Sequence, residues 1–360
     1  MSEEFIFSAP AAVAEDLTVY NVRQAPFSLH GLYKPYDTGL FKRLPDDVAL
    51  ALEEPIASLY TNTPGARVRF TTDSDVIAVG AVYAKTNFTS PLSAVMSGLG
   101  AYTFDLYADG AHVRALCPEN IYTEDCVSRF AFPERRYEAI APLAGKKMRE
   151  ITLFFPNFVN VSDVFIGLRK GSCVKEASPY RNQKPVVFYG SSITHGACAS
   201  RSGNAYPNLL SRRLGIDILN LGFAAGCRAE KTIIDYLCTL DPSVLVFDYD
   251  HNAPDLSYLE RTHLPALRAL RAAHPYIPFL LLSKPNIHTG REQARLRREL
   301  IERSAEALRA ESDAPVYFID GGEIYESFDS EMMTIDNTHP TDLGFFAMAC
   351  AVEKVLKNCF

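Results

Sequence analysis

The chain has 360 residues, of which 48% are hydrophobic and 22% charged, a composition typical of packed globular proteins and not of disordered ones. Its 36 basic and 43 acidic residues give a net charge of −7, which argues against a nucleic-acid partner, since proteins that read phosphate backbones carry a basic excess. No apolar run approaches the roughly 20 residues that a membrane-spanning helix needs, so we expect no membrane partner.

The start of the chain and its cysteines bear on location. Residues 1–5 contain two acids where a secretory signal carries positive charge, and no long apolar stretch follows. The eight cysteines form no CxxC pair and lie mostly in apolar segments, so we expect reduced, packed thiols. Together these features predict a cytoplasmic protein, and the sequence is also compatible with a homo-oligomer.

Short alternating runs separated by turn signals fill the first half of the chain, from about residue 18 to residue 168. Examples are residues 67–70, 76–79, 103–107 and 150–155. Many short strands with a turn about every ten residues are typical of an all-β sandwich or barrel. We therefore predict a β-sandwich domain over residues 1–175, with a polar linker over residues 171–183.

After Lys184 the pattern changes to apolar strands that alternate with amphipathic helices. Strands are predicted at residues 185–189, 216–219, 244–247, 279–282 and 316–319, and the clearest helices at residues 204–214, 291–310 and 341–357. Short apolar strands that alternate with helices indicate a parallel sheet covered on both faces. We predict a second, α/β domain with a five-stranded parallel sheet over residues 184–360.

The loops around these predicted strands carry the chemistry, because ligand sites in such sheets lie beyond the carboxyl ends of the strands. They read GSSIT at 190–194, NLGFAAG at 220–226, DYDHNAP at 248–254 and, before the last helix, DNTHP at 336–340. Together they contain a hydroxyl, a glycine-containing turn, an amide side chain and an Asp–His pair. This is the inventory for nucleophilic acyl transfer.

In order and placement these four loops resemble the sequence blocks of the SGNH/GDSL hydrolase superfamily, and the resemblance covers residues 184–360. It implies a flavodoxin-like fold and a catalytic triad in which Ser192 is the nucleophile, His339 the base and Asp336 its carboxylate partner. It also implies an oxyanion hole made by the backbone amides of Ser192 and Ala225 and the side chain of Asn252.

Three positions depart from the pattern of that superfamily. Ser191 replaces the Asp of G-D-S, so a carboxylate that usually braces the nucleophile loop is absent. Ala253 replaces the Asp that often follows the block Asn, and Ala225 replaces the oxyanion Gly, which is tolerable if its φ is negative. Gly222 is the residue that we expect to permit a tight turn after the second strand.

The β-rich half carries a second resemblance. Residues 98–100 (GLG), followed by Phe104-Asp105-Leu106-Tyr107, look like the G-x-D-L-Y signature of N-terminal jelly-roll domains that precede some bacterial SGNH esterases. Thr103 occupies the position of the expected Gly. The resemblance implies a jelly-roll-like sandwich, and in this subgroup the nucleophile loop tends to read G-S-S-I-T, which makes Ser191 normal.

Each of these residues also has a purely structural interpretation. Ser192 could cap the helix after the first strand, since Ser is favoured there. Asp336 and His339 could belong to an ordinary turn before Pro340, and Asn252 could satisfy loop backbone. The occurrence of all four blocks in one chain favours the catalytic interpretation.

Other polar residues near the predicted edge leave alternatives open. His195 could pair with Ser192, although a surface position or an indirect role is favoured. Asp250 and His251, with His339, have no spacing that justifies a metal site, so we predict neither a metal nor a cofactor.

Two cations and two thiols complete this set. Arg201 and Lys284 are candidate substrate-binding residues, or equally solvated charges. Cys198 and Cys227 lie near the predicted site, and packing is favoured over a reactive-thiol role, which would need a depressed pKa.

The combined expectation is a serine esterase that hydrolyses short-chain esters through an acyl-serine intermediate. For this pair of domains the resemblance favours O-acetyl groups on sugars, so the expected partner is a small-molecule or oligosaccharide ester. The chain contains no Trp, the commonest sugar-stacking side chain, although its 18 Tyr could substitute. The alternatives are an acyltransferase that uses the same triad and a glycan-binding protein whose hydrolase site is idle.

Overall fold

The structure is a computed structural model that describes residues 5–7, 16–84, 95–117, 135–285, 291–326 and 328–360. The chain divides into two compact units. The β unit comprises residues 1–43, 61–179 and 201–203, and the α/β unit comprises residues 44–60, 180–200 and 204–360. The units therefore exchange two segments, 44–60 and 201–203, across the boundary predicted between residues 175 and 184.

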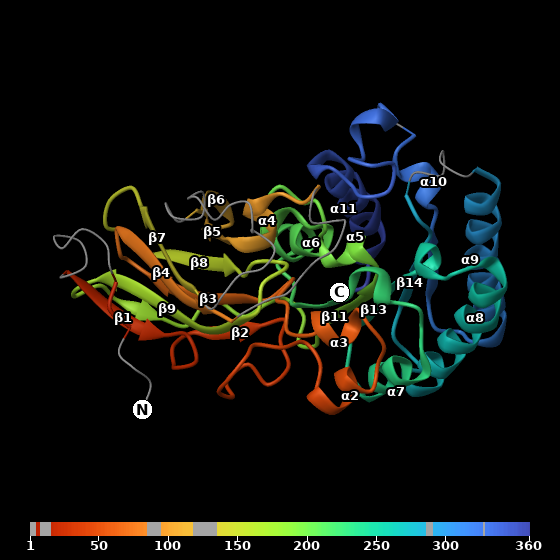
Figure 1. The fold of residues 1–360 in the computed structure, drawn as a ribbon, viewed down its shortest axis with the longest axis horizontal. Helices are drawn as coiled ribbons and strands as arrows, with labels where there is room; N and C mark the ends of the chain where they lie inside the picture. The colour runs from red at the N-terminus through yellow and green to blue at the C-terminus, as the bar shows by residue number, and fades with distance from the viewer. Residues whose placement is uncertain (1–4, 8–15, 85–94, 118–134, 286–290, 327) are drawn as a thin grey trace. The chain divides into compact units, whose positions relative to one another are not determined.

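The β unit is built from antiparallel strands, as the alternation in its sequence predicts (Figure 1). One sheet has the order β1 (Leu17–Asn21), β9 (Val161–Arg169), β4 (Val76–Tyr83) and β7 (Arg135–Pro142). The other has the order β10 (Val174–Lys175), β3 (Arg67–Thr72), β8 (Arg149–Phe154), β5 (Phe104–Ala108) and β6 (Ala111–Leu116), with β2 (Ser28–His30) also paired to β3. The short helix α4 (Gly98–Tyr102) precedes β5. The linker prediction is wrong at residues 174–175, because β10 pairs with β3.

A buried carboxylate in the β unit explains why residues 201–203 belong to it. Asp105 is fully buried and accepts hydrogen bonds from Tyr107 Oη at 2.8 Å, His112 Nε2 at 3.0 Å, Gly203 N at 3.1 Å and Arg201 Nη1 at 3.2 Å. A Cβ on Gly203 would lie 2.3 Å from Tyr107 Oη, so only glycine fits there. The two polar residues of the G-x-D-L-Y-like signature thus hold a segment from the second half of the sequence.

The α/β unit contains the predicted five-stranded parallel sheet, which is confirmed, in the order β12-β11-β13-β14-β15. Numbered from the first strand, this is the 2-1-3-4-5 order of flavodoxin-like folds. The strands are β11 (Val186–Gly190), β12 (Ile218–Gly222), β13 (Val244–Asp248), β14 (Phe279–Leu282) and β15 (Val316–Ile319).

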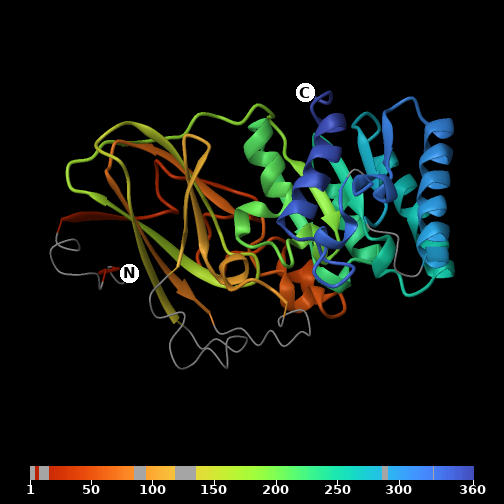
Figure 2. The same ribbon diagram turned by 90° about the horizontal axis from the view of Figure 1, so that it is seen from above.

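Helices cover both faces of this sheet, with α6 and α11 on one side and α7, α8 and α9 on the other (Figures 1 and 2). The helices are α2 (Asp46–Leu50), α3 (Ile56–Leu59), α5 (Ser192–His195), α6 (Tyr206–Leu214), α7 (Lys231–Thr239), α8 (Leu256–Ala273), α9 (Arg291–Glu311), α10 (Gly321–Ile324) and α11 (Asp342–Leu356). Short 3-10 turns are η4 (Ser202–Asn204), η5 (Ala224–Gly226), η6 (Asp250–Asn252) and η7 (Ser330–Met332).

The core of the α/β unit lies between the sheet and its covering helices. Val186, Phe188 and Val246 from the central strands pack with Leu210 of α6 and Phe345 of α11, and all five side chains are fully buried. Because both faces of the sheet are covered, its strands carry continuous apolar runs instead of an alternating pattern.

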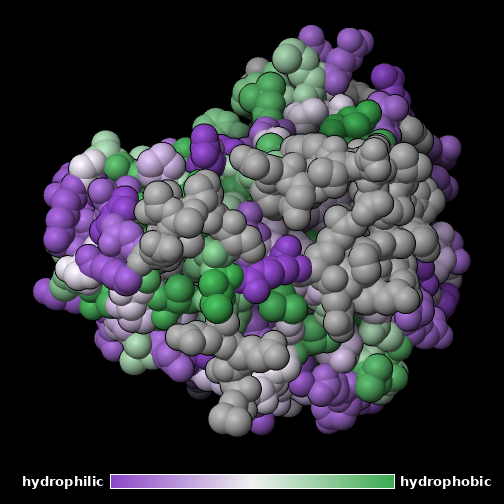
Figure 3. Space-filling model, turned by 60° about the vertical axis from the view of Figure 1, so that its left-hand side comes forward, coloured by the Kyte–Doolittle hydropathy of each residue, from purple (hydrophilic) through white to green (hydrophobic). Residues whose placement is uncertain are grey.

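Figure 3 shows one face of the molecule, and over its coloured part hydrophilic and hydrophobic side chains are interspersed. Within the described part of the chain, no helix combines the length and the apolar character needed to cross a membrane.

Gly222, the last residue of β12, has a role different from the one expected. Its φ does not lie in the left-handed region, so the turn itself does not require glycine. A Cβ at this position would instead lie 2.3 Å from His195 N and 2.7 Å from His195 Cα. Glycine is needed there because the backbone of α5 packs directly on the end of β12.

We predict that Gly222→Ala lowers the free energy of unfolding by about 1–3 kcal/mol, because the added methyl group must displace backbone atoms. Gly98→Ala is the matched control, since a Cβ on Gly98 meets nothing within 4 Å. Urea unfolding followed by circular dichroism measures both variants. Equal stability of the two would contradict the packing argument.

Candidate active site

The nucleophile turn joins β11 to α5 at the carboxyl edge of the parallel sheet. Gly190 ends the strand, Ser191 caps the helix by accepting a hydrogen bond from Ile193 N at 3.1 Å, and Ser192 is the first helical residue. A Cβ on Gly190 would lie 2.3 Å from Thr194 Oγ1 and 2.7 Å from Asp248 O, so glycine is required there by close packing. Ser192 is only 5% exposed.

The structure brings Ser192, His339 and Asp336 into one line. Ser192 Oγ lies 2.8 Å from His339 Nε2, and His339 Nδ1 lies 2.7 Å from Asp336 Oδ2. Since a carboxylate only accepts hydrogen bonds, Nδ1 carries the proton and Nε2 presents its lone pair to the serine hydroxyl. This arrangement can remove the hydroxyl proton and make Ser192 a nucleophile.

The surroundings of this line keep the carboxylate charged and the imidazole neutral. Burial alone would raise the pKa of Asp336, but hydrogen bonds from the backbone and ring of His339 and from Thr338 N outweigh it, so its pKa lies below the ordinary value. Burial lowers the pKa of His339, and the opposing interaction with Asp336 does not restore it. The imidazole is therefore available as a base at neutral pH.

The candidate oxyanion donors lie on the two strand ends beside the nucleophile turn. Asn252 Nδ2 donates a hydrogen bond to Ala224 O at 2.7 Å, which ties the loop after β13 to the loop after β12. The left-handed residue of the second loop is Ala224, with a φ of 49°, while Ala225 does not have a positive φ. Ala225 is exposed, so its side chain does not obstruct the turn.

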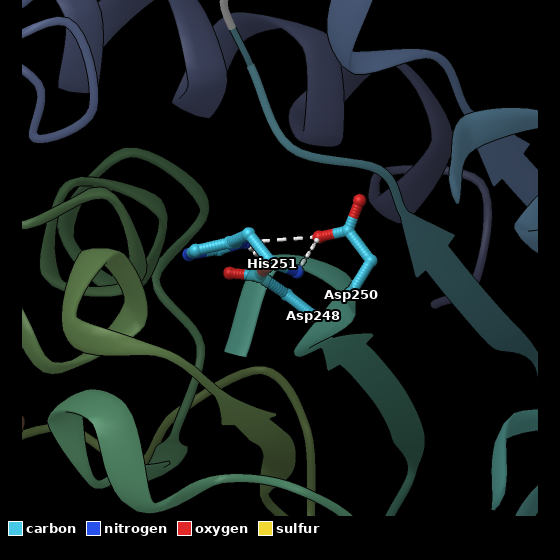
Figure 4. A group of neighbouring side chains, drawn as sticks. All are labelled: Asp248, Asp250 and His251. Carbon is cyan, nitrogen blue, oxygen red and sulfur yellow. Dashed lines mark hydrogen bonds and ion pairs between the residues drawn. The ribbon is translucent and has the colours of Figure 1, made fainter. Parts of the chain in front are cut away.

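The end of β13 and the loop that follows it hold a compact group of two carboxylates and a ring, shown in Figure 4. His251 Nδ1 lies 2.9 Å from Asp250 Oδ1 and 4.0 Å from Asp248 Oδ1. Among the described residues this is the one group of three with the spacing to hold a metal ion. Its carboxylates already accept internal hydrogen bonds, since Asp250 Oδ2 accepts from Lys284 N and Asp248 Oδ2 from Thr194 Oγ1.

The pKa values of the two carboxylates in this group are shifted in opposite directions, although burial acts to raise both. Burial raises the pKa of Asp248 to about 6, although His251 and the hydrogen bond from Thr194 act to lower it. At Asp250 burial is outweighed by the hydrogen bonds from His251 and Lys284 N, so its pKa lies below the ordinary value.

Arg297 is a site residue that sequence reasoning missed. From the first half of α9 its Nη1 donates to Asp250 O and, at 2.9 Å, to Ala253 O, and so it holds the loop that carries Asn252. No local signal could have identified it, because an arginine in an amphipathic helix resembles any solvated charge. Asp248 could have been found, since it is the acid that ends an apolar strand.

The two predicted substrate-binding cations have protein partners. Lys284 Nζ lies 3.2 Å from Thr338 Oγ1, and burial lowers the pKa of this lysine despite Asp250 and Asp336. The Arg201 guanidinium is engaged by Asp105 and Tyr107 within the β unit. A role toward substrate stays a prediction for both.

The remaining candidates are buried. His195 is fully buried, so the surface alternative for it is wrong. Burial raises the pKa of the Cys198 thiol to about 12, and Cys227 is fully buried with its Sγ 3.6 Å from Leu221 O. The Cys198 thiol therefore lacks the depressed pKa that reactivity requires, and all cysteines among the described residues are free.

Two family models match consecutive parts of the chain. Residues 183–357 match the GDSL-like lipase/acylhydrolase family, and residues 17–174 match the N-terminus of SGNH-hydrolase-type esterases, the GxDLY domain. No protein of curated function matches the chain.

Several solved structures share the fold over nearly the whole chain. A putative GDSL-like lipase from Bacteroides ovatus is 24% identical, with a TM-score of 0.76 over 95% of this chain and 98% of its own. The salicylyl-acyltransferase SsfX3 from a tetracycline biosynthetic pathway is 18% identical, with a TM-score of 0.75 over 96% and 98%. A family two carbohydrate esterase from Clostridium thermocellum is 13% identical, with a TM-score of 0.62 over 93% and 98%.

We predict that Asp336→Asn lowers the pKa of His339 further, because the hydrogen bond and charge of Asp336 are what raise it. NMR titration of the ring measures the shift. Asp235→Asn, which removes an exposed carboxylate paired with Lys231, is the matched control and should leave the ring titration unchanged. An increase in the pKa of His339 in Asp336→Asn would contradict the assigned cause.

Proposed function

Because the chain belongs to the GDSL-like lipase/acylhydrolase family and carries the N-terminal domain of SGNH-type esterases, we propose that it is a serine esterase for short-chain esters. The favoured substrates are O-acetyl esters of carbohydrates. The observation that carries this proposal is the line from Ser192 Oγ to His339 Nε2 at 2.8 Å and from His339 Nδ1 to Asp336 Oδ2 at 2.7 Å.

The first half-reaction acylates the serine. Ser192 Oγ attacks the ester carbonyl carbon while His339 Nε2 takes the hydroxyl proton, and Asp336 stabilises the imidazolium that forms. The negative charge on the carbonyl oxygen meets the N–H groups of Ser192 and Ala225 and the side-chain amide of Asn252. When the carbon–oxygen bond of the ester breaks, His339 returns its proton to the departing alcohol.

The second half-reaction releases the acid. A water molecule attacks the acyl carbon, His339 takes a proton from that water, and the bond to Ser192 Oγ breaks as the serine regains its proton. The same three donors stabilise the second tetrahedral intermediate. The products are the free carboxylic acid and the unmodified enzyme.

Burial and polarity at the site support a small acyl group on a hydroxyl-rich alcohol. Ser192 and His339 are only 5% and 7% exposed, which favours a small acyl group over a long chain at the reacting atoms. Polar side chains of His251, Asn252 and Thr338 come from the loops around the serine and suit the hydroxyl groups of a sugar. Family two carbohydrate esterases, one of them in complex with cellohexaose, share this fold.

A second candidate function is transfer of the acyl group to an alcohol acceptor other than water. The observation that favours it is the fold shared with the salicylyl-acyltransferase SsfX3. Product analysis with and without a candidate acceptor alcohol distinguishes the two: a hydrolase releases free acid at the same rate, whereas a transferase diverts the acyl group into a new ester.

We predict that Ser192→Ala lowers kcat for acetyl esters by about 10⁴-fold or more, because the nucleophile is lost while the fold is kept. The assay is a panel of acetylated mono- and oligosaccharides with p-nitrophenyl acetate as reference. Ser257→Ala removes an exposed serine on α8 and should behave as wild type.

Labelling by a fluorophosphonate separates the esterase from a glycan-binding protein with an idle site. An active serine becomes labelled in the wild type and in Ser257→Ala, and not in Ser192→Ala. Wild-type turnover in Ser192→Ala, or glycan binding without any labelling of the wild type, would contradict the proposal.

We also predict that kcat/KM is on its plateau at pH 7 and falls only below a midpoint lower than 6.5, the ordinary pKa of histidine. The base must be neutral, and burial lowers the pKa of His339, so acidification has to go further before the activity is lost. Initial rates from about pH 5 to about pH 8 give the midpoint. A midpoint above 7 would be inconsistent with a neutral, buried base.

A further inference from the structure

Among the described residues of the α/β unit, the mechanism leaves two buried carboxylates, Asp248 and Asp250, without a role, and Asp248 is the one in contact with the nucleophile turn. Asp248 is the last residue of β13, is 1% exposed, and pairs in register with Gly190, which immediately precedes the nucleophile turn. Its backbone oxygen accepts a hydrogen bond from Ser191 N at 2.9 Å. A buried carboxylate is costly unless its environment stabilises it, so its retention beside the nucleophile calls for an explanation.

Asp248 is tied to residues on both sides of Ser192. Its carboxylate oxygen Oδ2 accepts a hydrogen bond from Thr194 Oγ1 at 2.8 Å, and its backbone oxygen accepts the one from Ser191 N. Ser191 and Thr194 are the cap and the third residue of α5, so the two contacts span the first turn of that helix. Ser192 lies between them.

The same turn is held from its other sides by neutral groups. Asn220 Nδ2 donates to Thr194 O at 2.7 Å, and Tyr206 Oη lies 3.0 Å from Thr194 Oγ1. Gly190 approaches Thr194 so closely that a Cβ would not fit. The turn therefore has little freedom to move, and Asp248 supplies its charged contact.

The charged groups that face Asp248 come from its own strand end. His251 Nδ1 lies 4.0 Å from Asp248 Oδ1, and Asp250 is close enough to repel the Asp248 carboxylate. From α5 and α6 the facing groups are the hydroxyls of Thr194 and Tyr206.

The residue at position 191 departs from the G-D-S motif, and this departure bears on the contact of Asp248 with the nucleophile turn. There Ser191 stands in place of the Asp of G-D-S, so the nucleophile loop lacks its own carboxylate. An Asp at a helix cap can accept hydrogen bonds from the first turn, and the Asp248 carboxylate accepts one from the Thr194 hydroxyl of that turn across the strand pair.

We propose that Asp248 is a positioning residue for Ser192, and that it supplies from β13 the carboxylate that Ser191 does not supply from the nucleophile loop. The proposal rests on the esterase function proposed above. Asp248 acts on geometry through the hydrogen bond of its backbone oxygen with Ser191 N and the charged hydrogen bond of its carboxylate with Thr194, and these set the direction of the Ser192 hydroxyl toward His339.

The first test is Asp248→Asn, which keeps the shape and removes one acceptor oxygen. We expect kcat for p-nitrophenyl acetate to fall by about 10-fold to 100-fold with KM changed less than about twofold, because a small displacement of a nucleophile reduces the chemical step more than binding. Each rate is divided by the concentration of protein whose serine is labelled by fluorophosphonate at completion. Loss of folded protein therefore does not affect the comparison of kcat values. Asp241→Asn, an exposed carboxylate near Lys184, is the matched control and should keep the wild-type kcat.

The second test moves the carboxylate. Ser191→Asp alone places two buried carboxylates together and should lower both Tm and kcat, since like charges in a buried site repel. The double variant Ser191→Asp/Asp248→Asn has one carboxylate again and should recover at least about 10-fold of the kcat lost in Asp248→Asn. A purely structural role for Asp248 predicts no such recovery of kcat per labelled serine.

The outcomes separate this inference from the proposed function. If the wild type neither turns over acetyl esters nor reacts with fluorophosphonate, the esterase function is wrong. If the wild type is active and Asp248→Asn has the same kcat per labelled serine, the positioning role is wrong. A double variant that folds and stays slow, or that does not fold, also overturns the positioning role.

Discussion

The close approach of three parallel strand ends to one short helix is the constraint on which the site depends. Strand β11 lies between β12 and β13, so Gly190 has Gly222 on one side and Asp248 on the other. Helix α5 begins directly above them and leaves no space for a Cβ at either glycine. This packing places the hydroxyl of Ser192 beside loops that come from distant parts of the chain.

Three carboxylates at that edge have different pKa values, because they differ in the hydrogen-bond donors around them. Hydrogen bonds from N–H groups keep the pKa of Asp336 and Asp250 low, which suits a partner for a histidine ring in each case. Asp248 has fewer such donors, and burial raises its pKa to about 6. Residue type alone therefore does not set the role of an acid in this site; the number of donors around it does.

In the β unit, too, hydrogen-bond donors stabilise a buried carboxylate. Asp105 is fully buried and is stabilised by four donors, two of them from residues 201–203. Those residues lie in the second half of the sequence and still belong to the β unit. The signature that resembles G-x-D-L-Y is thus a structural clamp for a segment that is distant in sequence.

By itself, the sequence determined the two fold classes, the five parallel strands and the four loops at their carboxyl edge, because the period of apolar residues reports directly which face of each element is buried. Only the tertiary structure decided that residues 44–60 and 201–203 exchange units, that Gly222 serves close packing, and that Asp248 and Arg297 hold the loops beside Ser192. Such roles depend on which elements are in contact in the folded protein, and a local sequence pattern does not identify the element that a residue will contact.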